Sequence, residues 1–187
     1  PNSFTSTLQN PTIVGVTLAA AGTYTVTATV AGCTSPIATT VVVVNATPAA
    51  PTAGSNTPVC VGQTLNLTAS TIVGATYNWS GPNSFTSTLQ NPSIVGVTLA
   101  AAGTYTVTAT VSGCNSPNAT TTVVVNPTPA APVAGSNSPL CVGATLNLTA
   151  STIVGATYNW TGPNSFTSTL QNPSIASVTL AAAGTYS

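Results

Sequence analysis

Residues 99–111 read LAAAGTYTVTATV. The stretch begins with a corner of small residues that ends at Gly103, and it continues with strict alternation between apolar residues and threonines. Tyr105, Val107, Ala109 and Val111 therefore fall on one side. A period of two over eight residues predicts a β-strand with one buried face. The corner and the strand recur, in whole or in part, further along and earlier in the chain.

The strand belongs to a unit that is repeated. The stretch PNSFTSTLQNP begins at Pro1, Pro82 and Pro163, and both intervals are 81 residues. A period of this size is that of one compact β-sandwich. Residues 45–51 and 126–132 are rich in proline, which predicts semi-rigid linkers. We therefore expect the C-terminal part of one unit at residues 1–47, a complete unit at 48–127 and the N-terminal part of a third at 128–187.

Short alternating segments separated by turn signals predict an all-β sandwich with no helix, because Thr and Val fill the periodic positions. We expect about seven strands in the complete unit. Their predicted ranges are residues 52–61, 64–69, 75–80, 85–90, 97–99, 104–111 and 119–126. The valines at residues 41–44 are interpreted as a buried closing strand of the first unit.

The chain of 187 residues contains no Lys, Arg, Asp, Glu or His. Phosphate groups have no cationic partner here, so nucleic acid is not an expected partner. Calcium and zinc lack their carboxylate and imidazole ligands, and we expect neither a metal nor a cofactor. Ser and Thr nucleophiles lack a base to activate them, so the sequence predicts that the segment is not an enzyme.

An uncharged surface also lacks the repulsion that keeps proteins apart in solution. We therefore expect two kinds of partner, namely the neighbouring repeats of the same chain and other copies that associate into filaments or bundles. No apolar run is long enough to span a bilayer, so membrane insertion is not expected. Stability should be almost independent of pH from mildly acidic to mildly alkaline conditions, because only Cys, Tyr and the termini titrate.

Two motifs resemble the immunoglobulin fold. Trp79 lies in the third predicted strand, and Gly103, Tyr105 and Val107 follow in the spacing of that fold's tyrosine corner. In this resemblance Leu67 and Val107 occupy the positions of the two inter-sheet cysteines, and Ala101 replaces an acidic residue. The resemblance implies a buried core that contains Trp79, Tyr105, Val107 and Leu67, with apolar packing in place of a disulfide.

Further motifs resemble the tandem Ig-like and PKD-like repeats of Bacteroidota cell-surface and type IX-secreted proteins, which are associated with gliding motility and adhesion. The motifs are VCVG at residues 59–62, TYNWSGP at 76–82, AGTYTV at 102–107 and GCNS at 113–116. The resemblance covers the whole chain and implies an extracellular location, at the cell surface or secreted.

The chain has two cysteines per unit, one before the second strand and one at the tip of the last hairpin. They are Cys33, Cys60, Cys114 and Cys141. Their recurrence favours disulfides in an exported protein, and three arrangements remain open: a Cys60–Cys114 bond within a unit, a bond from Cys60 to the hairpin tip of the following unit, or free thiols.

In an immunoglobulin topology Cys60 and Cys114 lie at opposite poles, more than about 20 Å apart, whereas a disulfide needs a Cα separation below roughly 7 Å. The resemblance points the other way, since family members with a single unit carry both cysteines.

The sequence therefore predicts a structural repeat of an extracellular bacterial filament, stalk or adhesin that provides length and stiffness. The alternative is a ligand- or carbohydrate-binding module of a larger secreted adhesin. In that alternative Tyr77, Trp79 and Phe85 form a stacking platform for a glycan, and Asn78 and Asn83 supply hydrogen bonds. The competing interpretation of the same rings is core packing, because Tyr77 and Trp79 share the inward side of their strand.

Overall fold

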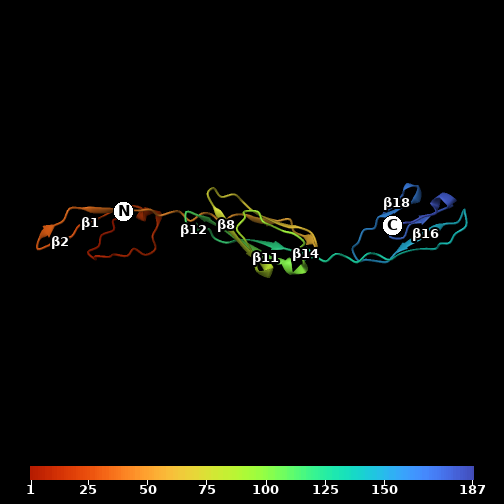
Figure 1. Ribbon diagram of the computed structural model, residues 1–187, viewed down its shortest axis with the longest axis horizontal. Coiled ribbons are helices and arrows are strands. Elements are labelled where there is room, and N and C mark those ends of the chain that lie inside the picture. Colours follow the sequence, from red (N-terminus) through yellow and green to blue (C-terminus); the bar gives the residue numbers. More distant parts are fainter. The chain divides into compact units, whose positions relative to one another are not determined.

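The computed structural model describes residues 1–187, which divide into two compact units, Pro1–Pro127 and Thr128–Ser187 (Figure 1). All regular structure is β-strand or single-turn 3-10 helix. The predicted all-β fold class is therefore confirmed. We describe each unit by itself.

The first 47 residues form a two-stranded antiparallel ribbon. Strand β1 (Gly22–Val26) pairs with β4 (Ala38–Val42), β2 (Thr29–Val30) pairs with β3 (Cys33–Thr34), and the turn η1 (Leu18–Ala20) precedes β1. The prediction of a buried strand at residues 41–44 is wrong here, because Val41 and Val43 are 71% and 76% exposed. Residues 1–47 contain no counterpart of the strands that would cover this ribbon.

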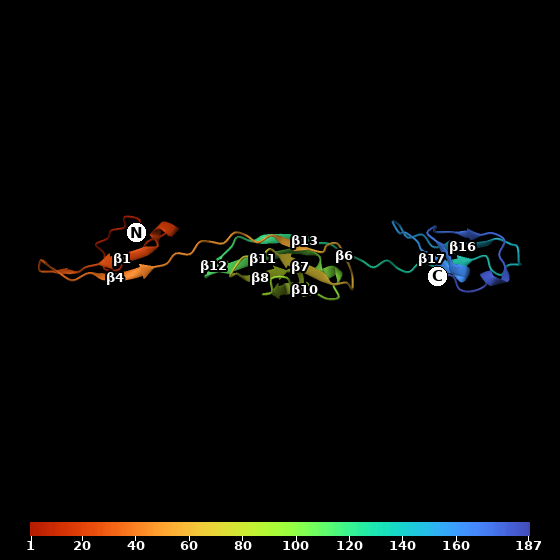
Figure 2. The same cartoon turned by 90° about the horizontal axis from the view of Figure 1, so that it is seen from above.

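Residues 48–127 form a two-layer sandwich (Figure 2). One sheet has the order β10-β7-β5 and contains β5 (Ala53–Ser55), β7 (Leu65–Ala69) and β10 (Ser93–Ile94). The other sheet centres on β11 (Gly103–Val111), which pairs with β8 (Thr76–Gly81), β12 (Cys114–Asn115) and β13 (Ala119–Val123), while β9 (Phe85–Ser87) extends it beyond β8. Strands β6 (Val59–Cys60) and β14 (Val125–Asn126) form a separate parallel pair.

The core lies between these two sheets. In β7 the residues Leu65, Leu67 and Ala69 are buried and alternate with exposed polar residues, as a half-buried strand requires. Strand β11 shows the same alternation, and its Val107 lies opposite Trp79 of β8. Each fully buried large side chain of this kind stabilises the fold by about 1.5–3 kcal/mol.

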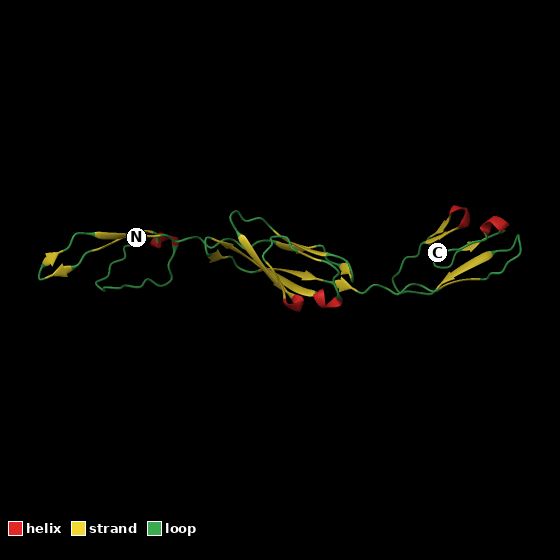
Figure 3. Cartoon of the chain, viewed as in Figure 1, coloured by secondary structure: helices red, strands yellow, loops and turns green.

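A corner fixes the entry into β11. The Tyr105 hydroxyl donates a hydrogen bond to the carbonyl oxygen of Ala101, at 3.0 Å, in the turn η3 (Leu99–Ala101). The Phe85 ring meets the Tyr105 ring edge-on, with centroids 5.5 Å apart. The turn η2 (Pro82–Ser84) contacts η3, and both appear as short red turns in Figure 3.

Three predicted strands differ from the structure. The edge strand expected at residues 52–61 is two strands, β5 and β6, because Pro58 has no N–H to donate and the chain changes partners there. At residues 97–99 the chain is already entering η3, and the strand pairing lies earlier, at β10. The strand expected at 119–126 divides at Val124, where the chain leaves β11 to pair with β6.

The unit Thr128–Ser187 has the elements that correspond to the N-terminal part of the repeated unit. Strand β16 (Leu146–Ala150) pairs with β15 (Ala134–Ser136) and β19 (Ser174–Ile175), and β17 (Trp160–Gly162) pairs with β18 (Phe166–Ser168). The turns η4 (Pro163–Ser165) and η5 (Leu180–Ala182) follow β17 and β19. Residues 157–159, which correspond to the first half of β8, are not in a strand here.

The close approach of Gly81 to Tyr105 generates a test of the packing. A Cβ atom at Gly81 would overlap the Tyr105 ring, whose Cε1 atom would lie 2.6 Å away. We expect Gly81→Ala to destabilise the central domain by about 1–3 kcal/mol, the cost typical of overpacking. Urea unfolding followed by Trp79 fluorescence in a Trp160→Phe background measures this change.

The matched control is Ser80→Ala, at the neighbouring exposed position, which should shift the free energy of unfolding by less than about 0.5 kcal/mol. Equal unfolding midpoints for Gly81→Ala and Ser80→Ala would contradict the packing described here.

Candidate functional site

The aromatic residues of the alternative glycan platform lie inside the central domain. Trp79 is fully buried, and its indole Nε1–H donates to the carbonyl oxygen of Gln90 at 3.2 Å. Tyr77 is 6% exposed; its hydroxyl donates to the Ser70 carbonyl at 3.0 Å and accepts the Ile72 N–H at 2.8 Å. These two rings present no open face on which a sugar would stack, and the third ring, Phe85, is half-buried with its ring edge-on to Tyr105.

The two asparagines of the same hypothesis are placed elsewhere. Asn78 is exposed and alternates with Tyr77 and Trp79 along β8, so it projects away from the rings. Asn83 is exposed in η2, where its φ of 59° places it in the left-handed region. The structure therefore does not gather these five residues into one site.

The four predicted core residues do come together. Trp79, Tyr105, Val107 and Leu67 are each 0% exposed and belong to one cluster between the two sheets. Leu67 lies in β7 and Val107 in β11, so apolar side chains from the two facing sheets occupy the positions that the resemblance assigned to a disulfide. No buried side-chain nitrogen or oxygen lacks a hydrogen-bond partner.

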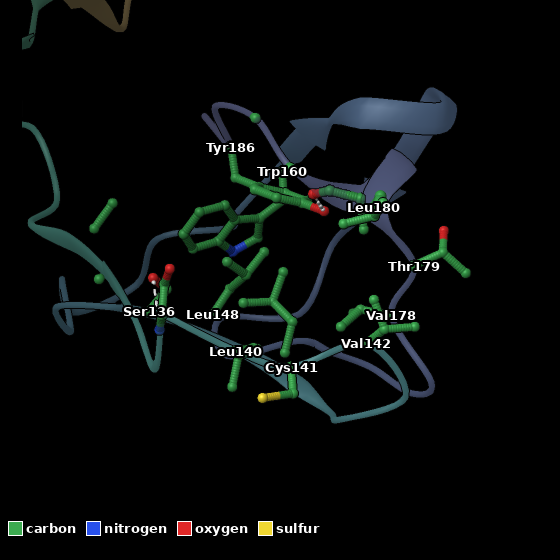
Figure 4. Close-up of a pocket in the computed structure, with 17 residues that line it drawn as sticks. Ser136, Leu140, Cys141, Val142, Leu148, Trp160, Val178, Thr179, Leu180 and Tyr186 are labelled. Carbon is green, nitrogen blue, oxygen red and sulfur yellow. Dashed lines mark hydrogen bonds between the residues drawn. The ribbon is translucent and has the colours of Figure 1, made fainter.

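A cavity of about 420 Å³ opens in the unit Thr128–Ser187 (Figure 4). Its lining includes Leu146, Leu148, Trp160 and Val178. One period of 81 residues earlier, the same positions are Leu65, Leu67, Trp79 and Val97, which are core residues of the central domain. In that domain residues from β11, β13 and β14 complete the core, so the cavity marks an uncovered core and not a ligand site.

The cysteines of the central domain lie at its two ends. Cys60 is in β6 beside the end of β14, whereas Cys114 is in β12 at the tip of the last hairpin (Figure 2). Strand β11 runs between these ends, and its nine residues span roughly 27 Å at the usual rise per residue. A disulfide needs Cα atoms within roughly 7 Å, so this geometry does not allow a Cys60–Cys114 bond within the domain.

None of the four cysteines is bonded to another: Cys33, Cys60 and Cys141 are exposed, and Cys114 is half-buried. Sequence reasoning missed the residue that the structure places against Cys114, which is Asn45. The signal for it in the sequence was that asparagine recurs at the first position of both proline-rich linkers, at residues 45 and 126.

The electrostatics of the domain are unusual because only Tyr, Cys and the termini titrate. Burial raises the pKa of Tyr105 above its ordinary value of 10, because desolvation disfavours the phenolate. The chain offers no side-chain carboxylate, imidazole or amine.

The comparisons with known proteins concern the central domain and its fold. Residues 48–127 match the model of the family described as "Ig-like domain CHU_C associated". The predicted resemblance to Ig-like repeats of Bacteroidota proteins is confirmed over these residues. No curated protein matches the sequence. The chain holds no helix with the length and hydropathy needed to cross a bilayer.

Several solved structures match the chain at low sequence identity. Murine CEACAM1b is 18% identical, with a TM-score of 0.43, over 73% of this chain and 89% of that chain. The three N-terminal domains of the bacteriophage RB49 outer capsid protein Hoc are 16% identical, with a TM-score of 0.41, over 73% of this chain and 52% of that chain. A three-domain fragment of titin is 17% identical, with a TM-score of 0.40, over 87% of this chain and 66% of the titin chain.

The raised pKa of Tyr105 predicts how stability depends on pH. Tyr105 holds its proton more tightly in the folded state than in the unfolded state. Its contribution to the free energy of unfolding is therefore complete below the unfolded pKa, and it is lost as the pH rises through the folded pKa. We expect the free energy of unfolding to be flat from about pH 4 to 8 and to fall above about pH 10. Chemical denaturation across this range measures the profile.

Tyr105→Phe removes both effects of the hydroxyl on stability, its hydrogen bond to Ala101 and its titration at alkaline pH. It should lower stability at neutral pH by about 1 kcal/mol through the lost hydrogen bond to Ala101, and it should reduce the alkaline decline. Tyr24→Phe removes the corresponding hydroxyl in residues 1–47 and should leave the central domain's decline unchanged. An undiminished decline in Tyr105→Phe would show that another group is responsible.

Proposed function

We propose that the chain is a structural part of an extracellular bacterial array, starting from the match of residues 48–127 to the family model of Ig-like, CHU_C-associated domains. Each unit extends a stalk, filament or adhesin and adds stiffness to it. The observation that carries this proposal is the burial of two of the three rings that a binding face would need. Trp79 and Tyr77 are buried, and their polar atoms are hydrogen-bonded within the domain.

The recurrence of the unit supports the proposal. The sequence repeats at an interval of 81 residues, and proline-rich residues join the units. Prolines at this density favour an extended, semi-rigid connection. A rigid sandwich joined by stiff connections is suited to keeping a fixed distance between two points.

The surface supports an association between copies. The side chains that hydrate the surface are those of Thr, Ser, Asn and Gln, because no charged side chain is present. Neighbouring chains therefore meet without like-charge repulsion. Val73 and Val95 are 91% and 81% exposed and add apolar contact area. We propose that filaments or bundles form by lateral contact between such surfaces.

An extended chain provides a direct test of the spacer role. Duplicating residues 48–128 in frame adds one unit and keeps the interval of 81 residues. We expect the maximum dimension from small-angle X-ray scattering to rise by roughly 35–45 Å, the length of about eight strand residues plus a linker. The unaltered chain of 187 residues is the reference. An increase of less than about 15 Å, which would mean that units fold back on one another, would contradict a spacer.

A glycan array tests the alternative on the same chain. A spacer should bind no glycan above background. Saturable binding of a glycan that is lost on substitution of Asn78 or Asn83 to Ala would overturn the spacer role and support a carbohydrate-binding module. Substitution of exposed Thr68 to Ala, on the opposite sheet, is the matched control.

A further inference from the structure

One asparagine position of the repeated unit lies beside a cysteine in both copies in which it occurs. This asparagine is Asn45 in one copy and Asn126 in the next. Asn126 is the last residue of β14, where it lies opposite Cys60 in the parallel pair with β6. Its carbonyl oxygen accepts the Val61 N–H at 2.9 Å. This asparagine is therefore next to the first cysteine of its own domain.

Asn45 shows what the same position contacts in the domain that follows it. Its side-chain Nδ2 donates to the carbonyl oxygen of Ser112 at 3.0 Å, and the Cys114 thiol donates to its backbone carbonyl oxygen at 3.7 Å. Ser112 and Cys114 form the tip of the β11–β12 hairpin. The asparagine is therefore also next to the second cysteine of the following domain.

We infer that a disulfide joins consecutive complete units, from the cysteine at the Cys60 position of one domain to the cysteine at the Cys114 position of the next. The 3.7 Å contact of the tip thiol is with the carbonyl oxygen of Asn45, and the 2.9 Å hydrogen bond of the amide after Cys60 is with that of Asn126. Asn45 and Asn126 occupy the same position of the repeated unit, so superposing the two copies places both cysteine positions beside one asparagine.

The side chains are suitably directed. Paired residues of adjacent strands project to the same face of a sheet, so Cys60 and Asn126 point to one side. In the other copy, the Asn45 side chain points at the hairpin tip. Cys60 is exposed and Cys114 is half-buried, so both thiols are accessible to an oxidant. A disulfide needs Cα atoms roughly 4.4–6.8 Å apart. Two cysteines that both lie next to the same asparagine can approach each other to this distance.

The same relation explains why no two cysteines bond in this chain. Cys33 and Cys114 occupy hairpin tips, while Cys60 and Cys141 occupy the other end of their units. No two of the four cysteines are in the relation that the inferred bond requires, which is the Cys60 position of one unit and the Cys114 position of the next.

The bond forms by thiol–disulfide exchange with an oxidised dithiol carrier or a small-molecule disulfide. Two Cys–SH groups give Cys–S–S–Cys, and the oxidant's disulfide receives the two electrons and two protons to become two thiols. The inference goes beyond the proposed function, because a covalent link between units holds equally for a spacer and for a binding module.

The contact at Asn45 is testable in the chain of 187 residues. In a background with Cys33, Cys60 and Cys141 changed to Ser, Asn45→Cys should form a disulfide with Cys114 after incubation with oxidised glutathione, so that no free thiol is counted. Thr47→Cys in the same background is the control and should leave both thiols free. Two free thiols in Asn45→Cys would overturn the contact on which the inference rests.

The direct test uses the chain with residues 48–128 duplicated, which contains two consecutive complete units. One variant keeps only Cys60 of the first copy and Cys114 of the second, and the other keeps only Cys60 and Cys114 of the first copy. After oxidation, pepsin digestion and mass spectrometry should find the cross-linked peptide in the first variant and free thiols in the second. The reverse pattern, or disulfide-linked dimers on a non-reducing gel, would overturn the inference.

Unfolding under reducing conditions should be the same for both variants, which shows that both have folded. The thiol count is independent of chain dimensions and glycan binding, so its outcome is separate from that of the proposed function.

Discussion

The packing of Trp79 between two sheets is the interaction on which the central domain depends. Trp79 is fully buried, lies beside Val107 in the register of β8 and β11, and has its indole N–H bonded to the Gln90 carbonyl. Leu67 reaches the same core from the facing sheet. A covalent bridge at this place is unnecessary, because close-packed apolar side chains supply the cohesion between the layers.

A chain without charged side chains must satisfy its buried polar groups with neutral partners. Tyr105 and Tyr77 do this by donating to backbone carbonyl oxygens outside the strands, at Ala101 and Ser70, and Gln90 donates to the carbonyl oxygen of Ala69 at the end of β7. These hydrogen bonds satisfy the polar side chains and also hold the adjoining loops in place. Asn56 has a similar role: its side chain bonds to the backbone at both Thr64 and Asn66. Amide and hydroxyl groups thereby provide the local order that ion pairs and capping carboxylates provide in other domains.

The sequence predicted the parts of the fold that depend on local periodicity. Strand β11 and the corner at Tyr105 followed from alternation and from one glycine, and the inward side of β8 followed from Tyr77 and Trp79. The division of the first edge strand at Pro58 did not follow, because the choice between two partner sheets depends on where β14 lies in space. The exposure of Val41 also could not be predicted from the sequence pattern, because burial of a strand depends on whether a second sheet covers it. Asn45 was missed because its contacts are made across 67 and 69 residues of sequence.

The parallel pairing of β6 with β14 has a mechanical consequence. These strands lie near the two ends of the domain's sequence, and tension applied through the linkers pulls them in opposite directions along their common axis. The Val59 N–H bonds to the Val124 carbonyl and the Val61 N–H to the Asn126 carbonyl, at 3.1 Å and 2.9 Å. Force along these two strands loads both hydrogen bonds in shear at the same time, instead of opening them one after the other.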